Sequence, residues 1–395
     1  MTARLSLRHK TGEECLRILM IGAYPRSLQR IDGGVAAAIT YLSQALMEEN
    51  GVELIGVRTG VPGAEMKHDQ GFGFPIYDLH GGALGLSTLY RRQARQFAEL
   101  VDRIRPDIVH GQGADMAGYL AVGCGAPSVV TVHGIIGEDS KYQGSLKARV
   151  RSALTGRLIE RSTIRRATDL ISISPYVAEY YGAEIRGRIH DVPNAIASKY
   201  FEVQRSPVPG RVLFAGRLIR RKGVLDLIRA VAQVGAPVRR VVLAGALSDA
   251  VYVDSLRQEI ARCGLPNLVD FRGLLDERAM LAEFATAEVL VLPSYQETAP
   301  MVIQQAMACG VPVLASNVGG IASQICDGTS GMLFHPGDIV GMAASLGRVL
   351  TDSELARSLG QEGMARATRL YRAENVAAAT LQAYRRALGD PGGCR

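Results

Sequence analysis

The segment from residue 216 to residue 223, with the sequence GRLIRRKG, combines glycine and cations in the way that anion-binding loops do. It follows a short apolar run and precedes a helical pattern, so its backbone N–H groups would face a ligand near a helix N-terminus. Arg217 and Lys222 would bring positive charge to the same ligand. The chemistry that fits is the binding of a phosphate or diphosphate, and the alternative is a solvated basic loop.

Two further polar residues stand where a strand is expected to end. Glu297 lies in PSYQETAPMV, between a buried apolar run and a helix that extends to Cys309. A carboxylate at this place either accepts hydrogen bonds from hydroxyl groups of a ligand or caps the helix. His133 ends the run TVH and precedes Gly134, where a histidine is either a ligand-facing side chain or a structural one.

These residues need parallel strands to bring them together, and the sequence contains a regular succession of such strands. Apolar runs rich in β-branched residues recur about every 20–40 residues, with helical patterns between them, which predicts parallel sheets of βαβ units. Ligands of such sheets bind beyond the carboxyl ends of the strands. The expected strands are Arg17–Gly22, Val52–Val57, Asp107–His110, Ser128–Val132, Leu170–Ser172, Arg188–Val192, Arg211–Ala215, Arg240–Ala244, Leu268–Phe271, Val289–Leu292, Val311–Ala315 and Met332–Phe334.

The stretch 197–210, which contains SPVPG, reads as a linker between two halves of similar size. The predicted fold is therefore α/β, with two Rossmann-like, doubly wound domains that face a deep cleft. A glycine turn at Gly33 and Gly34 is expected to open the first long helix, and Ala377–Leu388 is expected to be helical without a following strand. The expected segments are a polar tail at 1–14, a first domain at 15–200, a second domain at 208–370 and a helical end at 371–395.

Composition narrows the class of protein. The chain has 395 residues, of which 47% are hydrophobic and 21% charged, which excludes intrinsic disorder as the main state. The six cysteines form no C-x-x-C pair and the chain has no Asp-x-Asp pair, so no metal site is expected. No apolar stretch approaches the roughly 18 residues of a membrane-spanning helix, and the N-terminus lacks the apolar core of a secretory signal. The expected location is the cytoplasm.

The net charge of +7 comes from one stretch of the chain. The window 141–166 holds eight basic side chains and a single acidic one, Glu160. Aromatic residues are only 6% and tryptophan is absent, so platforms for base stacking are scarce and no nucleic-acid partner is expected. Apolar and basic residues share one sector of the expected helix, and Gly156 is expected to break it, which predicts a poor amphipathic anchor.

Two interpretations of this basic stretch stay open: a solvated surface, or a patch for an anionic acceptor or for the inner surface of a membrane. The second would make the protein a peripheral membrane protein. The residues of the patch would be Lys147, Arg149, Arg151 and Arg157.

Taken in order, the motifs resemble those of the family 4 glycosyltransferases. The second half carries FAGRLIRRKGV, VLPSYQETAPMVIQQAMACGVPVLASNVGG and DGTSGMLFHPGD. The first half carries GAYPRSLQRIDGGV, RPDIVHGQG, TVHG, ISISPYV and VPNAI. The resemblance covers residues 16–388. It implies a GT-B fold whose last helix crosses back to the first domain, and a retaining, metal-independent transfer of a sugar from a nucleotide-diphosphate sugar to an acceptor hydroxyl.

The resemblance also implies roles for single residues. Arg217 and Lys222 match the pair that binds the donor diphosphate, while Glu297 and His133 match catalytic residues that face the transferred sugar. No cofactor is implied besides the donor substrate, for which a UDP-sugar is expected because UDP is the commonest nucleotide of the family. The acceptor stays open between a glycan, a lipid-linked molecule and a small molecule. The other implied donor-binding residues are Gly33, Gly34, Gly273, Leu274, Met301 and Val302.

The sequence departs from the family pattern at two positions. Gln305 replaces the second acid of the E-x7-E motif, and Ser323 replaces an acid after the VGG turn. An amide can still pair with two ribose hydroxyls but lacks a charge, so we expect donor binding to be weaker by about 1–2 kcal/mol. The alternatives are a catalytically degenerate subunit that binds a nucleotide or glycan, and a sugar-nucleotide epimerase of the same fold. Because the other candidate site residues are kept, an active glycosyltransferase is expected.

Overall fold

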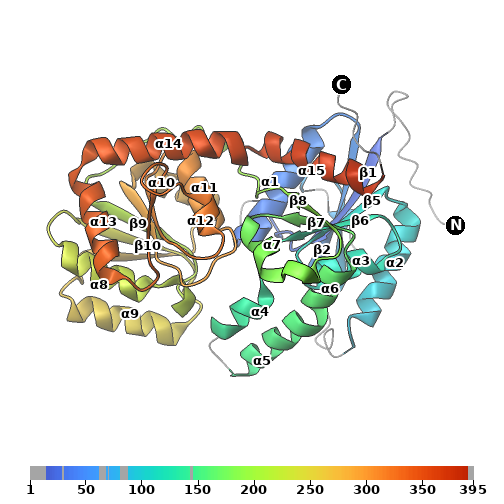
Figure 1. The fold of residues 1–395 in the computed structure, drawn as a ribbon, viewed down its shortest axis with the longest axis horizontal. Coiled ribbons are helices and arrows are strands. Elements are labelled where there is room, and N and C mark those ends of the chain that lie inside the picture. Colours follow the sequence, from blue (N-terminus) through green and yellow to red (C-terminus); the bar gives the residue numbers. More distant parts are fainter. Residues whose placement is uncertain are drawn as a thin grey trace.

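Two sheets flanked by helices lie side by side along the long axis of the molecule (Figure 1). This computed structural model describes residues 15–28, 31–61, 68–69, 71–80, 88–142 and 146–389. The polar tail predicted at residues 1–14 lies outside the described residues.

The first sheet has the strand order β3-β4-β2-β1-β5-β6-β7-β8, and its neighbouring strands are parallel except for the pair β3 and β4. Its central strands are apolar and buried, as expected for a sheet that is covered on both faces. The strands are β1 (Leu16–Gly22), β2 (Val52–Val61), β3 (His68–Asp69), β4 (Ile76–His80), β5 (Ile108–Gln112), β6 (Ser128–Val132), β7 (Asp169–Ser172) and β8 (Arg188–Asp191). The helices are α1 (Gly34–Glu48), α2 (Arg91–Ile104), α3 (Met116–Gly123), α4 (Ile136–Asp139), α5 (Leu146–Thr155), α6 (Arg161–Arg166) and α7 (Pro175–Tyr181).

The second sheet has the order β11-β10-β9-β12-β13-β14, and all of its neighbouring strands are parallel. The chain enters at β9 and turns from one side of the sheet to the other between β11 and β12, so β9 and β12 flank a topological switch point. The strands are β9 (Arg211–Ala215), β10 (Arg240–Ala244), β11 (Val269–Gly273), β12 (Val289–Leu292), β13 (Val313–Ser316) and β14 (Met332–Phe334). The helices are α8 (Val224–Val234), α9 (Ala250–Arg262), α10 (Glu277–Thr286), α11 (Met301–Ala308), α12 (Ile321–Gln324), α13 (Ile339–Thr351), α14 (Ser353–Tyr371) and α15 (Ala373–Ala387).

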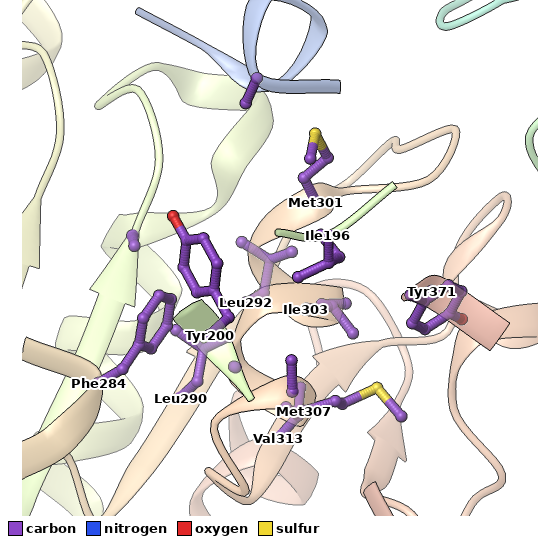
Figure 2. Close-up of a cluster of buried hydrophobic side chains, with 14 of the residues drawn as sticks. Ile196, Tyr200, Phe284, Leu290, Leu292, Met301, Ile303, Met307, Val313 and Tyr371 are labelled. Atoms are coloured by element: carbon purple, nitrogen blue, oxygen red, sulfur yellow. The ribbon is translucent and has the colours of Figure 1, made fainter. Parts of the chain in front are cut away.

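The last two helices connect the two sheets. Helix α14 lies over the second sheet and α15 lies beside α1 over the first, which confirms the predicted crossing (Figure 1). The helix starts at Ala373 rather than at Ala377, and the Ile196 N–H donates to the carbonyl oxygen of Tyr371 (2.7 Å) at the crossing. Figure 2 shows the apolar cluster at this junction, with Met301 at the start of α11 and with Tyr200 and Met307 deeper in the cluster. The start of α11 therefore lies where the two domains meet, in contact with α1.

Each strand that the sequence predicts is present, with ends that differ by a few residues. The sequence failed to predict β3 and β4. Strand β3 has only two residues and carries no pattern, and β4, with the sequence IYDLH, has neither a β-branched apolar run nor a regular alternation of apolar and polar residues.

Candidate functional site

The predicted anion-binding loop lies at the carboxyl end of β9 and contacts the segment after β12. Lys222 Nζ donates to Glu297 Oε1, and the Ser294 hydroxyl donates to the same oxygen (2.7 Å). Both side chains of the ion pair are about nine-tenths buried. The fold thus joins a cation and a carboxylate that stand 75 residues apart in the chain.

Arg221, which the sequence did not single out, is the residue that fixes this arrangement. Its Nη1 donates to the Gln296 carbonyl oxygen (2.6 Å) and to Gln296 Oε1 (2.9 Å), and it lies 3.5 Å from Glu297 Oε2. Its Nε lies 3.7 Å from Asp139 Oδ1, which belongs to the first domain. Arg217, in contrast, is exposed, and its side chain makes no hydrogen bond or ion pair with the described part of the chain. Among the arginines of the loop, Arg221 is therefore structural, while Arg217 is open to a ligand.

Burial and charge act in opposite directions on Glu297. Burial alone would raise the pKa of its carboxyl group, but Lys222 and Arg221 outweigh burial and hold that pKa below its ordinary value. Burial lowers the pKa of Lys222, and Glu297 opposes this shift. Asp139 lies within the field of the same cations, and burial raises its pKa. Since the pKa of Glu297 lies below its ordinary value, its carboxyl group is ionised at neutral pH, and Lys222 lies in hydrogen-bond contact with it.

A glycine turn presses directly against the backbone of Glu297 and Thr298. The Gly320 N–H donates to the carbonyl oxygen of Glu297 (3.1 Å), and a Cβ on Gly320 would lie 1.6 Å from the carbonyl oxygen of Thr298. Ser174 of the first domain donates from Oγ to that same Thr298 oxygen (2.8 Å). Only glycine fits between these groups. Ser323 lies one turn later, in α12, where its hydroxyl donates to the Gly320 carbonyl oxygen (2.8 Å).

Two helix N-termini from opposite domains meet beside the loop. Gly33, with φ of 96°, precedes α1, and a Cβ on Gly34 would lie 3.7 Å from Met301 Cγ. Met301 is buried and opens α11, and Figure 2 shows its side chain directed toward α1. Neither helix has a side-chain cap at its start, and in α11 the Ile303 N–H donates to the Pro300 carbonyl oxygen (3.1 Å). The Val302 N–H before it is open to an anion.

His133 follows β6, at the carboxyl end of the first sheet, where it is one member of a buried polar chain. Its Nε2 donates to Gln112 Oε1 (2.6 Å), which leaves Nδ1 as the acceptor. Burial lowers the pKa of His133 to about 4, so the ring is neutral at pH 7. Asn194, beside His133, donates from Nδ2 to the carbonyl oxygen of Ala299 in the second domain (3.4 Å). A neutral histidine here can orient a hydroxyl group but holds no proton to donate from Nδ1.

The series of buried hydrogen bonds continues from Gln112 to the crossing helix α15, a connection that the sequence did not predict. His110 shares hydrogen bonds with the Tyr384 hydroxyl through Nδ1 (2.6 Å) and with the Thr131 hydroxyl through Nε2 (2.7 Å). Gln112 Nε2 lies 3.3 Å from the same ring. Burial lowers the pKa of His110 to about 3. His110 and Gln112 are two residues apart in β5, so their side chains lie on the same face of the sheet. That spacing is the signal in the sequence that indicates their contact.

The remaining predicted donor residues lie at two different places. Gly273, with φ of 66°, ends β11, and its carbonyl oxygen accepts from the Gly245 N–H at the end of β10 (2.7 Å). Leu274 follows and is 44% exposed. Gln305 lies in α11, where its Nε2 donates to the Tyr200 hydroxyl (3.0 Å). The structure thus aligns Gly273 with the strand ends that hold the loop, while Gln305 contacts the linker residue Tyr200.

The basic residues of the window 141–166 lie on and just before one continuous helical stretch at the edge of the first domain. The prediction that Gly156 breaks the helix is wrong, because a π-helical turn at Gly156–Glu160 joins α5 to α6. Gly156 is buried, and a Cβ there would lie 3.0 Å from the Gly137 nitrogen, so glycine serves close packing against α4. Lys147, Arg149 and Arg157 are exposed.

Arg151 faces a polar pocket of about 410 Å³ behind α5. The pocket opens at the carboxyl ends of β2 and β5, on the edge of the first sheet that faces ligands in this fold class. Hydroxyl, amide and carboxylate groups dominate its wall, as expected for a site that binds a polar molecule. The lining residues are Thr59, Gly60, Tyr90, Gln93, Asp115, Met116, Ile136, Arg151, Ser152 and Thr155.

Comparison with known proteins assigns the chain to a family. The model of glycosyltransferase family 4 matches residues 32–199, and the model of glycosyl transferases group 1 matches residues 199–366. The chain belongs to the family 4 glycosyltransferases. It is accordingly a glycosyltransferase enzyme, as its motifs predicted.

Curated relatives and solved structures agree with this assignment. A glycogen synthase of Mycobacterium tuberculosis is 29% identical over 83% of this chain and 80% of the relative. A D-inositol 3-phosphate glycosyltransferase of Paenarthrobacter aurescens is 28% identical over 90% of this chain and 93% of the relative. Among solved structures, sucrose-phosphate synthase from Thermosynechococcus elongatus has a TM-score of 0.79 at 22% identity and covers 95% of this chain and 99% of its own. Anabaena HepE in complex with UDP and glucose has a TM-score of 0.70 at 19% identity, with 93% and 98% covered. These structures confirm the GT-B fold.

Proposed function

We propose that this enzyme transfers a sugar from a UDP-sugar to an acceptor hydroxyl with retention of the anomeric configuration and without a divalent metal. The observation that carries the proposal is the cluster of Arg217, Lys222 and Glu297 at the carboxyl ends of β9 and β12, opposite His133. The cluster combines cations for a diphosphate with a carboxylate for sugar hydroxyls. The solved relative HepE binds UDP, which makes UDP the first nucleotide to test here.

The donor would lie along the ends of the second sheet. Its diphosphate would meet Arg217, Lys222 and the open N-terminus of α11 at Met301 and Val302, with the Gly33–Gly34 turn across from it. The base would contact the backbone at Gly273 and Leu274. The ribose would pair with Gln305, whose amide accepts from one hydroxyl and donates to the other. Nothing in the comparisons supports the alternative of an inactive subunit.

Catalysis would depend on charge at the leaving group. As the bond from the anomeric carbon to the phosphate oxygen breaks, negative charge grows on the diphosphate, where Arg217, Lys222 and the α11 dipole stabilise it. The acceptor oxygen bonds to the anomeric carbon on the face that the leaving group vacates, and the acceptor proton passes to the departing phosphate oxygen. Glu297 and neutral His133 would orient the sugar hydroxyls through hydrogen bonds, and neither forms a bond to the sugar.

The acceptor would bind in the polar pocket behind α5. Arg151 gives that pocket a cation, and Lys147, Arg149 and Arg157 are exposed on the same helical stretch. This favours an acceptor that carries hydroxyl groups and at least one negative charge.

The experiment that tests the donor site compares Lys222→Ala and Glu297→Ala with Arg220→Ala, an exposed cation of the same loop. Nucleotide sugars are first screened by thermal shift, and transfer is then measured with the donor that stabilises the protein. Loss of one charged contact to the leaving group is expected to lower the turnover by about 10²–10³-fold, with Arg220→Ala near wild type. Near-normal transfer in Lys222→Ala would overturn the assignment.

Proton NMR of the product tests the stereochemistry, and turnover in excess EDTA tests the role of metal. The expected product keeps the anomeric configuration of the donor, and EDTA is expected to leave the rate unchanged. An inverted product or a rate restored only by added divalent metal would contradict the mechanism.

A further inference from the structure

Helix α5 carries a row of apolar side chains that nothing in the described chain covers. The helix buries none of its residues and lies at the lower edge of the first domain in Figure 1. Leu146, Val150 and Leu154 are 75%, 51% and 45% exposed, and Leu158, in the π-turn after the helix, is 48% exposed. Elsewhere in the described residues, large exposed apolar side chains occur singly or in short runs, which needs no explanation. Four such side chains in a row on one helix do need an explanation.

The π-turn straightens this row. Residues spaced by four drift about 40° per step around an α-helix, so a row of four would wind onto a second face. The turn at Gly156–Glu160 contains more residues than an α-helical turn and cancels most of the last step. Leu158 therefore lies beneath Leu154, and the four residues form one continuous band. We call Leu146, Val150, Leu154 and Leu158 the α5 stripe.

Cations without acidic partners border the stripe. Lys147, Arg149 and Arg157 are exposed, and none of them makes an ion pair with the described residues. The single acidic residue of the window, Glu160, is buried and accepts hydrogen bonds from the Ile136 and Gly137 N–H groups (2.6 and 3.1 Å), so its carboxylate is turned inward. The surface around the stripe is thus apolar along its centre and positive at its edges.

The prediction of a poor amphipathic anchor rested in part on a helix break at Gly156, and the helix continues through that residue. We propose that the α5 stripe docks this enzyme on the surface of a bilayer that contains anionic lipids. An apolar band would enter the boundary between headgroups and acyl chains, while the long basic side chains reach the phosphates beside it. A second copy of this chain fits worse, because a two-fold contact would place the same cations opposite one another. No helix in the described part of the chain is long and apolar enough to cross a membrane.

The two faces of α5 give this docking a consequence for the enzyme. Arg151, Ser152 and Thr155 point away from the stripe and line the polar pocket. A docked enzyme would therefore hold that pocket beside the lipid surface, within reach of an acceptor whose polar group is anchored in the membrane. The docking itself rests on the stripe and its cations, and does not depend on the proposed donor site.

The test is co-sedimentation of the full chain with vesicles of phosphatidylcholine, with and without about a third of phosphatidylglycerol. The variants are Val150→Ser with Leu154→Ser, and Arg149→Gln with Arg157→Gln. The matched controls are Val251→Ser with Val340→Ser, at apolar residues that are 73% and 71% exposed on the second domain, and Arg278→Gln, an exposed cation there. Thermal stabilisation by UDP is measured on the Val150 and Leu154 double variant to show that the donor site is intact.

The wild type and the controls are expected to bind the anionic vesicles and not the neutral ones. The apolar double variant should bind about tenfold less or weaker still, and the double arginine variant should lose about fivefold for each charge. Equal binding by the apolar variant, or no binding by the wild type, would overturn the proposal. A dimer in sedimentation velocity that the apolar variant abolishes would assign the stripe to a second copy instead. Vesicle binding without any nucleotide binding would leave the docking standing while the proposed donor site fails.

Discussion

Replacing Arg221 with methionine should destabilise the second domain strongly, while the same change at Arg217 should not. The Arg221 side chain is 9% exposed and its Nη1 donates two hydrogen bonds to Gln296, at 2.6 and 2.9 Å, beside the carboxylate of Glu297. Arg217 is four residues away in the same loop, is exposed, and makes no such contact with the described residues. The pair therefore separates a structural cation from a ligand-facing one in a single loop.

The size of the effect follows from the lost contacts. Hydrogen bonds from a charged donor contribute about 1.5–3 kcal/mol each, and Arg221→Met removes two of them from a buried carbonyl and a buried amide. Removal of one partner from a buried ionic network costs about 3–5 kcal/mol. Lys222 still pairs with Glu297 in the variant, so we expect the total loss of stability to stay within this range. For a domain of this size, such a loss lowers the melting temperature by roughly 6–20 °C.

The assay is thermal unfolding followed by circular dichroism, with UDP binding measured by calorimetry on the same samples. Arg217→Met should melt within about 2 °C of the wild type and bind UDP more weakly, because exposed substitutions cost little stability. The reasoning is refuted if Arg221→Met melts as the wild type does, or if the two variants lose equal stability.

Three further predictions follow from close contacts in and around the site. Gly320→Ala should abolish soluble expression or lower the melting temperature sharply, because its Cβ would lie 1.6 Å from the Thr298 carbonyl oxygen. Gln112→Leu removes the acceptor of the His133 Nε2–H, so turnover should fall about tenfold or more while UDP binding in calorimetry stays unchanged. Stability should fall as the pH drops from 6.5 toward about 4, because burial lowers the pKa of His133 to about 4 and that of His110 to about 3, and the unfolded chain then binds more protons than the native one. Melting curves across this range measure the slope, which His110→Asn should flatten; an unchanged slope would mean that carboxylates govern it.

The strands and their order along the chain could be predicted from the sequence, because a buried parallel strand is an unbroken apolar run and a helix between two runs forces a crossover. The failures occurred where that signal is missing. Strand β4, IYDLH, is not an unbroken apolar run, and β3 is two residues long. At Gly156, helix propensity predicted a break, but close packing against Gly137 makes glycine the residue that fits and the helix continues.

The site shows the same division. Arg217, Lys222, Glu297 and His133 could be named from the sequence, because glycine turns, charges and strand ends are local features of a chain. The sequence also identified Gln305 as a departure from the family pattern. It did not predict the contact of Gln305 with the hydroxyl of Tyr200.

The sequence by itself determined which residue types lie at the carboxyl ends of the strands, because that follows from the order of short segments. Only the tertiary structure decided which cation is free and which is buried, since Arg217 and Arg221 are alike until the loop meets Gln296. It also decided that the tautomer of His133 depends on Gln112, and that the basic window presents its leucines outward. Whether a side chain is buried, and which groups it contacts, depends on segments that are distant in the chain, so a local sequence pattern does not predict either.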